Sequence, residues 1–307
     1  MRVAVMAAGA VGGYFGARLA AAGHDVTFFA RGAHLDAIRR NGLRVESGLG
    51  DIHLNEVKAT DDPASVAPVD VVLFAVKLWD TERAAEPLKP LVRPHTRVIT
   101  LQNGIDSVER LTAILGADAV VGGTTYLVTM IAAPGLIRHT GPYAVIRCGR
   151  VDGRADPTLA GYVKDMRAAG IDITLSDEMQ LELWKKFVLL AGTSGITAST
   201  RQTMGVIRAD PDMRALLFKL TGEATAVAKA AGIAFAPDFA REIARAIEVF
   251  PPTMKASMAN DLEAGNRLEL DWLAGKVVSL GRALGVPTPA NEAVYAILKA
   301  YRMGSRH

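Results

Sequence analysis

The chain has 307 residues, of which half are hydrophobic and 22% are charged, and its formal net charge is +3. That length is enough for two domains with separate cores. Lysine and arginine are dispersed rather than clustered, so nothing favours a nucleic-acid or membrane partner. Cys148 is the single cysteine and the six histidines lack ligand spacing, which excludes an internal disulfide and predicts no metal site.

The beginning of the chain is not expected to be a signal peptide. It enters an apolar strand directly, without the basic and apolar regions of a signal peptide. Its apolar runs are shorter than the roughly 18 residues that cross a bilayer. We therefore expect a cytoplasmic protein.

The first thirty residues have the pattern of a dinucleotide-binding βαβ unit. A strand over Val3–Met6 enters a glycine turn, and a small-residue helix over Tyr14–Ala22 precedes a second strand over Val26–Ala30. Gly9 would let the backbone approach a pyrophosphate, and Gly12 would let the helix pack closely on the strand. The helix N-terminus would attract the phosphates. The expected cofactor contacts of this turn are Ala8, Gly9, Ala10, Val11 and Gly12.

Two further residues refine this expectation. Ala7 stands where the pattern has its first glycine, and alanine accepts the turn without strain only at negative φ; otherwise the cost is about 1 kcal/mol or more. Arg31 ends the second strand, where NAD-specific domains usually carry an acidic residue. A cation suits the 2′-phosphate of NADP, and with the glycine turn upstream we favour this role over the alternative of a solvated arginine at a strand end.

The rest of the first half alternates strands and helices, which predicts a doubly wound, Rossmann-type sheet over residues 1–176. The expected strands are Leu43–Glu46, Ile52–Leu54, Val69–Val76, Arg97–Leu101, Ala119–Thr125 and Ile171–Leu175. The expected helices are Ala33–Arg40, Asp80–Leu91, Ile105–Leu115 and Pro157–Ala169. Shorter β segments around Gly135–Ile146 are expected to form an antiparallel edge.

From residue 177 the apolar positions follow helical spacing, with no convincing strand. The pattern predicts an all-helical substrate and dimerisation domain over residues 177–307, with Ser176-Asp177 capping its start. The expected helices are Met179–Ala191, Met213–Ala231, Phe239–Val249, Lys255–Glu263, Leu270–Leu284 and Asn291–Tyr301.

Polar residues follow several predicted strands, at the sheet edge where α/β proteins bind ligands. Lys77 follows the most apolar strand, and Gln102-Asn103-Gly104 follows the next. Singly, the lysine is explained by a solvated strand end and Asn103 by a turn. Jointly, around a nucleotide-binding turn, they favour function.

In the helical half, Lys186 and Glu269 stand out because both sit among apolar residues. Lys186 neighbours Leu183 and Leu190 at helical spacing and lies beside Lys185, so partial burial and a positively charged neighbour would lower its pKa and suit it to act as an acid. A lysine that reaches solvent is the equally weighted alternative. Glu269 either faces a ligand or supports a helix N-terminus.

These segments, in this order, resemble the ketopantoate reductase (2-dehydropantoate 2-reductase) family along essentially the whole chain. The resemblance rests on the glycine turn, Arg31, Val76–Trp79, Gln102–Gly104, Trp184–Lys186 and Lys255–Glu269. It implies that Lys186 is the general acid and that Glu269 orients the substrate hydroxyl. It also implies that Asn103 and Ser257 hold substrate, that Lys77 lines the nicotinamide end of the site and that Arg31 contacts the 2′-phosphate. Lys77, Asn103 and Glu269 are also expected beside the cofactor.

Three positions depart from the family pattern. Leu190, Ser194 and Met254 stand where well-studied members carry asparagines. Lost hydrogen-bonding partners can change substrate preference by orders of magnitude. The exact keto acid is therefore less defined than the chemistry.

The sequence thus predicts an NADPH-dependent oxidoreductase that reduces a 2-keto acid, foremost ketopantoate to pantoate in pantothenate and coenzyme A biosynthesis. Its expected partners are that small molecule and, as an option, a second copy in a homodimer. One alternative is a reductase of another bulky 2-keto acid or carbonyl compound. The other is a non-enzymatic NADPH-sensing protein, in which Lys186 and Glu269 would be dispensable.

Overall fold

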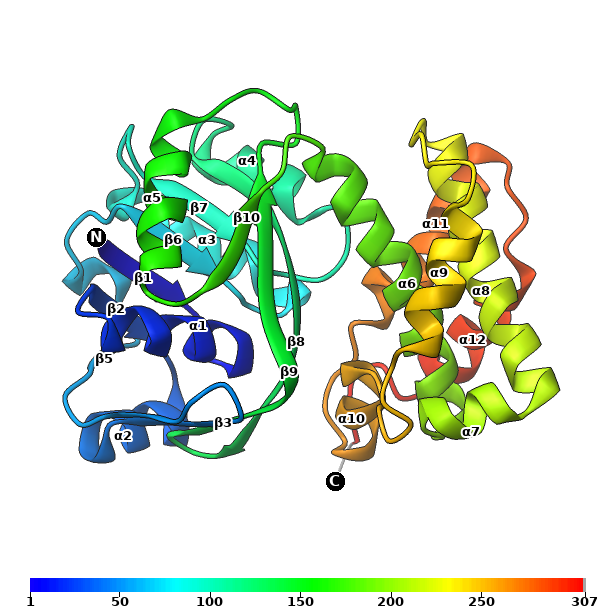
Figure 1. Cartoon of the computed structure of the whole chain (residues 1–307), viewed down its shortest axis with the longest axis horizontal. Coiled ribbons are helices and arrows are strands. Elements are labelled where there is room, and N and C mark those ends of the chain that lie inside the picture. Colours follow the sequence, from blue (N-terminus) through cyan, green and yellow to red (C-terminus); the bar gives the residue numbers. More distant parts are fainter. Residues whose placement is uncertain (306–307) are drawn as a thin grey trace. The chain divides into compact units, whose positions relative to one another are not determined.

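The structure is a computed structural model that describes residues 1–305 (Figure 1). The chain divides into two compact units, Met1–Leu183 and a second unit that begins at Trp184. The division falls inside the long helix α6 (Met179–Thr200). The domain boundary expected from the sequence, at residues 176/177, lies just before this helix.

The first unit is α/β. Its strands are β1 (Arg2–Met6), β2 (Asp25–Phe29), β3 (Leu43–Ser47), β4 (Ile52–Leu54), β5 (Lys58–Thr60), β6 (Val71–Phe74), β7 (Arg97–Thr100), β8 (Val120–Ala133), β9 (Leu136–Gly149) and β10 (Asp172–Leu175). Its α-helices are α1 (Ala10–Ala21), α2 (Gly32–Asn41), α3 (Thr81–Ala85), α4 (Ser107–Leu115) and α5 (Pro157–Ala168). Short 3₁₀ helices are η1 (Pro63–Ser65), η2 (Leu78–Asp80) and η3 (Glu86–Leu91).

These strands form one sheet in the order β4-β3-β9-β8-β7-β6-β1-β2-β5, and β10 pairs with β9. β1 is parallel to both β2 and β6, and β6, β7 and β8 continue in parallel. The carboxyl ends of these strands therefore meet at one edge. The Rossmann-type sheet predicted from the sequence is confirmed.

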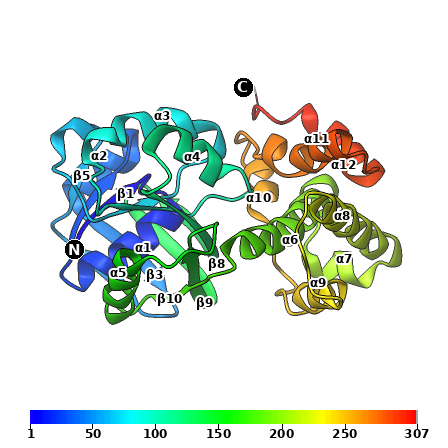
Figure 2. The same cartoon turned by 90° about the horizontal axis from the view of Figure 1, so that it is seen from above.

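Alternate residues of the central strands feed two hydrophobic layers, one on each face of the sheet. In β1, Val3 and Val5 pack with α1, α2 and α5, whereas Ala4 and Met6 pack with α3, η3 and α4. Figure 2 shows α1 and α5 on one side of the sheet and α3 and α4 on the other. Because both faces are covered, β6 is apolar throughout and β1 is apolar from Val3 to Met6.

Two expectations for the first unit were wrong. Of the predicted helix Asp80–Leu91, only α3 is α-helical, and the part from Glu86 onward is the 3₁₀ helix η3, because Pro87 and Pro90 have no amide hydrogen to continue an α-helix. The segment Gly135–Ile146 is no edge: β8 and β9 form a long antiparallel hairpin, and β9 lies inside the sheet between β8 and β3.

The second unit is helical, and no strand occurs from residue 176 to residue 305. After α6 come α7 (Met204–Ala209), α8 (Pro211–Ala230), α9 (Phe239–Glu248), α10 (Ser257–Glu263), η4 (Leu270–Trp272), α11 (Ala274–Leu284) and α12 (Pro289–Lys299). The all-helical second half is confirmed. Helix α6 runs well past the predicted end at Ala191, and the predicted helix Leu270–Leu284 is interrupted at Leu273, whose φ of −110° and ψ of −99° are not helical.

Within residues 1–305, no helix combines the length and hydrophobicity needed to cross a bilayer.

Candidate active site

The glycine turn joins the end of β1 to the start of α1. Ala7 has φ of +66°, in the left-handed region that an alanine adopts at a cost of about 1 kcal/mol or more. The next residue returns to the sheet, because the Ala8 amide donates to the Phe29 carbonyl oxygen over 2.7 Å. That amide is therefore used within the fold, and the free amides of the turn begin after it.

The two glycines of the turn differ in their surroundings. A Cβ added to Gly9 would meet no atom within 4 Å, whereas one added to Gly12 would lie 2.9 Å from Val5 Cγ1 and closer still to the Ala7 carbonyl oxygen. Gly12 thus permits tight packing of α1 on β1. Gly9 leaves open space beside the first turn of α1, where Ala10 and Val11 lie. This arrangement fits a dinucleotide pyrophosphate.

Arg31 follows β2 at the same edge of the sheet. It precedes α2, and its side chain is exposed and makes no hydrogen bond or ion pair to another described residue. Within residues 1–305 it is thus a cation with no partner beside the glycine turn. It is well suited to a phosphate.

His34 fixes the glycine turn, a role that the sequence did not reveal. Its Nε2 lies 2.8 Å from the Ala8 carbonyl oxygen, and its Nδ1 accepts from the Gly135 amide over 3.1 Å. The ring therefore joins the turn to the tip of the β8–β9 hairpin. Only the folded hairpin brings Gly135 here, so no local sequence signal could have shown it.

Lys77 and Asn103 follow β6 and β7, which are neighbours in the sheet. Both are partly buried, and the Lys77 ammonium lies 5.7 Å from the centre of the Trp79 ring. The buried Gln102 ties the two strand ends together, since its Nε2 donates to the Val76 carbonyl oxygen over 3.1 Å and to Thr81 Oγ1 over 2.9 Å. In the motif Gln102-Asn103-Gly104, the glutamine therefore supports the loop that carries Lys77.

In the second unit, Lys186 lies on α6 and is partly buried, with buried Leu183 and Phe187 close to it in the helix. Burial lowers its pKa to about 8, and the negative charge of Glu269 opposes that shift in part. Glu269 is itself only 5% exposed. The structure therefore brings these two predicted residues within electrostatic reach. An ammonium with this pKa can donate a proton near neutral pH.

Lys185 plays a different part from its neighbour. Its ammonium lies 3.4 Å from Glu242 Oε1, and its side chain is 26% exposed. The low pKa of Lys186 arises from burial and needs no contribution from Lys185.

Ser257 begins α10 and is exposed. The segment before it is fixed to the end of α6 and the start of α7. The Ala256 amide lies 3.4 Å from Thr197 Oγ1, and the Met204 amide donates to the Met254 carbonyl oxygen over 2.9 Å. The Ser257 hydroxyl is thus presented from a well-held backbone.

The three departures from the family pattern occupy the same unit. Leu190 and Met254 are partly buried, and Ser194 is fully buried. The Ser194 hydroxyl has no hydrogen-bond partner among the described residues. The short Ser194 side chain thus leaves a buried hydroxyl that makes no hydrogen bond to the described residues.

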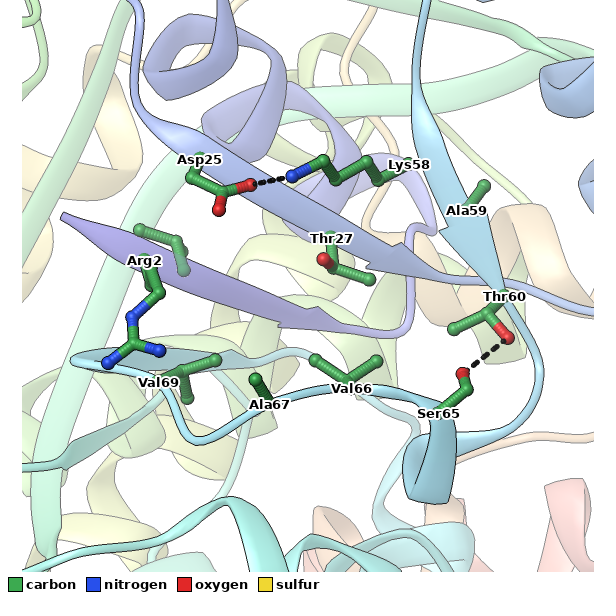
Figure 3. A pocket seen from close by; sticks show the side chains of 11 residues that line it. Arg2, Asp25, Thr27, Lys58, Ala59, Thr60, Ser65, Val66, Ala67 and Val69 are labelled. Atoms are coloured by element: carbon green, nitrogen blue, oxygen red, sulfur yellow. Dashed lines mark hydrogen bonds and ion pairs between the residues drawn. The ribbon is translucent and has the colours of Figure 1, made fainter.

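A separate cavity of about 350 Å³ lies in the first unit (Figure 3). It extends from the amino ends of β1, β2 and β5, whereas Gly9 and Lys77 follow carboxyl ends. Four of its polar side chains pair with one another: Lys58 with Asp25 at 2.7 Å, and Thr60 with Ser65 at 3.4 Å. None of the predicted site residues lines it.

Comparison with known proteins identifies relatives along the whole chain. Residues 3–153 match the family described as ketopantoate reductase PanE/ApbA, and residues 178–302 match its C-terminal counterpart. A 2-dehydropantoate 2-reductase of Mesorhizobium japonicum is 32% identical over 97% of each chain. Two crystal structures are similar: a PanE/ApbA family ketopantoate reductase from Ralstonia eutropha (35% identity, TM-score 0.90, 98% of each chain) and a 2-dehydropantoate 2-reductase from Geobacter metallireducens (31%, TM-score 0.91, 98% of this chain and 99% of that one).

Proposed function

The chain belongs to the ketopantoate reductase family, whose members are NAD(P)-dependent oxidoreductases acting on CH–OH groups, and we propose that it reduces ketopantoate to pantoate with NADPH. The observation that supports this most is the pairing of a partly buried lysine of lowered pKa, Lys186, with the buried carboxylate of Glu269. That pair supplies a proton and a fixed negative charge at one place. Reduction of a ketone to an alcohol requires such a proton donor.

The choice of NADPH rests on Arg31. It is an exposed cation, without a partner among the described residues, and it follows β2, where an acidic residue would instead favour a free ribose 2′-hydroxyl. A 2′-phosphate would meet this guanidinium, while the amides at the start of α1 would hold the pyrophosphate. Lys77 and Asn103 would contact the nicotinamide end.

When bound, the cofactor supplies the hydride. Lys186 would donate its Nζ proton to the ketone oxygen as that oxygen becomes an alkoxide, and its charge would stabilise the oxygen before transfer. The Glu269 carboxylate would accept a hydrogen bond from the hydroxyl so formed. It would also help to keep Lys186 protonated. Asn103 and Ser257 would hold the substrate through their polar side chains.

A second substrate class follows from Leu190, Ser194 and Met254. Two of these side chains are apolar and the third is short, so the pocket wall offers fewer hydrogen bonds than three asparagines would. A bulky apolar 2-keto acid would be less penalised here than in a more polar site. The reaction would be the same.

An NADPH-oxidation assay tests both proposals. Ketopantoate and a panel of 2-keto acids with larger apolar groups are compared by kcat/KM, and each is repeated with NADH. A preference for ketopantoate with NADPH supports the main proposal, and a preference for a bulkier acid supports the second. No oxidation with any 2-keto acid would contradict both. The cytoplasmic location and the homodimer remain predictions, and size-exclusion chromatography with light scattering tests the latter.

A further inference from the structure

Glu269 lies on a short, well-buried stretch of chain between α10 and α11. Its neighbours Leu268 and Leu270 are 1% and 0% exposed, so the backbone on both sides is anchored in the core. The Glu269 carbonyl oxygen accepts from the Trp272 amide over 3.1 Å at the start of η4. The direction of the carboxylate therefore depends on what holds this stretch.

The backbone before Glu269 is paired with the end of the described chain. Helix α12 is followed by residues 300–305, here called the C-terminal turn. The Leu268 amide donates to the Arg302 carbonyl oxygen over 2.9 Å, and the Ser305 amide donates to the Gly265 carbonyl oxygen over 3.0 Å. The two segments thus lie side by side and run in opposite directions.

Glycine is required where they touch. Gly304 has φ of +84°, and a Cβ on it would lie 2.5 Å from the Gly265 carbonyl oxygen and 3.2 Å from the Arg267 amide nitrogen. Gly265 has φ of +68°, and an added Cβ there would collide with Ser305. Substitution at either position would push the two backbones apart.

A side-chain contact holds the other side of Glu269. The Tyr295 hydroxyl, from α12, donates to Asp271 Oδ1 over 2.8 Å, and Arg302 Nη1 lies 3.7 Å from Asp271 Oδ2. The Tyr295 ring packs close to α11, because a Cβ on Gly275 would lie 2.8 Å from its Cε2. Asp271 is thus fixed by two groups from the C-terminal end.

We propose that the C-terminal turn and Tyr295 form a clamp that positions the Glu269 carboxylate for the reaction. One contact of the clamp lies before Glu269, at Leu268, and another lies after it, at Asp271. The inference rests on the proposed function for the role of Glu269, whereas its geometry rests on the hydrogen bonds, the ion pair and the glycine contacts described above. The clamp residues act through Glu269 and need not touch substrate.

The test uses the full-length chain and three variants. Tyr295→Phe removes the hydroxyl that binds Asp271, and Gly304→Ala separates the two backbones. Tyr301→Phe is the matched control, because it makes the same chemical change at a side chain that forms none of the clamp contacts. That side chain is 47% exposed, and its hydroxyl has no hydrogen bond among the described residues. We expect kcat/KM to fall by about tenfold in the first two variants and to stay unchanged in the third.

The discriminating readout is the protonation of Lys186. The Glu269 charge raises the pKa of Lys186, so a displaced carboxylate lets that pKa fall further. Among the described residues, Glu269 is the one whose charge shifts the pKa of Lys186, and the adjacent Lys185 pairs with Glu242 at 3.4 Å. We expect the alkaline limb of the pH–rate profile to move to lower pH in Tyr295→Phe and Gly304→Ala. An unchanged limb, whatever happens to the unfolding midpoint, would overturn the clamp.

A second measurement keeps this test independent of the substrate. The pH dependence of Lys186 modification by an amine-reactive reagent, read by peptide mapping, reports the same protonation without turnover. A downward shift in the two clamp variants supports positioning even if wild-type protein fails to reduce ketopantoate. Wild-type turnover combined with labelling curves that match in all variants would overturn the clamp and leave the proposed function standing.

Discussion

Lys186 is the side chain on which the proposed chemistry depends most. Replacing it with alanine removes the proton donor while the nucleotide-binding unit keeps all its residues. We expect Lys186→Ala to lower kcat by roughly 100-fold or more, with NADPH affinity nearly unchanged. Steady-state kinetics and NADPH fluorescence titration measure the two effects.

Lys185→Ala is the matched control for that variant. It removes an ammonium one position away whose partner, Glu242, is about half exposed. Such a surface pair contributes about 1 kcal/mol or less to stability, so activity should be retained. Equal losses in both variants would mean that a general decrease in positive charge, rather than the proton of Lys186, explains the effect.

The same residue sets the expected pH dependence. Lys186 must be protonated to act as an acid, and its pKa lies at about 8. Turnover should therefore be constant below that pH and fall as pH rises through it. Glu269→Gln removes the charge that raises this pKa, so the fall should begin at lower pH. A limb that stays in place in Glu269→Gln would show that another group controls it.

Ala7 gives a prediction about stability. With φ of +66°, it holds strain that glycine would not. Relief of this strain is worth about 1–2 kcal/mol, which exceeds the entropic cost of the greater freedom that glycine has in the unfolded chain. Ala7→Gly should therefore raise the free energy of unfolding by up to about 1 kcal/mol. Denaturant unfolding measures this. Ala20→Gly, within α1, is the control and should instead lower the free energy of unfolding by about 1 kcal/mol. If both variants lost the same stability, Ala7 would not be strained.

Among the elements, helix α5 is joined to the sheet by a buried ionic cluster. Asp156 accepts the Leu159 amide at the helix start, and it pairs with Arg97 and Arg150 at 2.7 Å each. Burial raises the pKa of Asp156, but hydrogen bonds from Arg97 and the helix amide, with both arginine charges, outweigh it and hold the pKa below the ordinary 3.8. Asp156 is therefore ionised at neutral pH, and its ion pairs with both arginines are present.

Removing this carboxylate should therefore be costly. Asp156→Ala leaves two buried guanidinium groups unpaired, for an expected loss of about 3–5 kcal/mol of unfolding free energy. In the wild type the contribution of Asp156 is complete above its unfolded pKa and disappears as pH falls below about 4. Urea unfolding at several pH values measures both. The free energy of unfolding should decrease more steeply with falling pH in the wild type than in Asp156→Asn. Equal slopes would contradict this role of Asp156.

The sequence predicted elements best where local pattern decides them. The βαβ start and the helical second half follow from apolar spacing, which also offered the burial of Lys186 and Glu269 as one of two alternatives for each. The end of α-helix within the segment 80–91 could have been predicted from Pro87 and Pro90. The depth of β9 in the sheet could not, because its parallel partner β3 is distant in the chain. The links from His34 to Gly135 and from Leu268 to Arg302 are equally non-local, so only the fold reveals them.

At the scale of the whole molecule, cofactor choice should appear in its thermal stability. A ligand that binds only the native state stabilises it by about 2.7 kcal/mol at 100 times its Kd. If Arg31 binds the 2′-phosphate, NADPH should raise the unfolding midpoint more than NADH at equal concentration. Arg31→Ala should remove most of that difference while leaving the midpoint without ligand unchanged, since Arg31 is exposed. Arg241→Ala removes an exposed arginine of the second unit and is the control, in which NADPH should still raise the unfolding midpoint more than NADH. If that difference disappeared in Arg241→Ala as well, the preference for NADPH would arise from net charge and not from Arg31 at the end of β2.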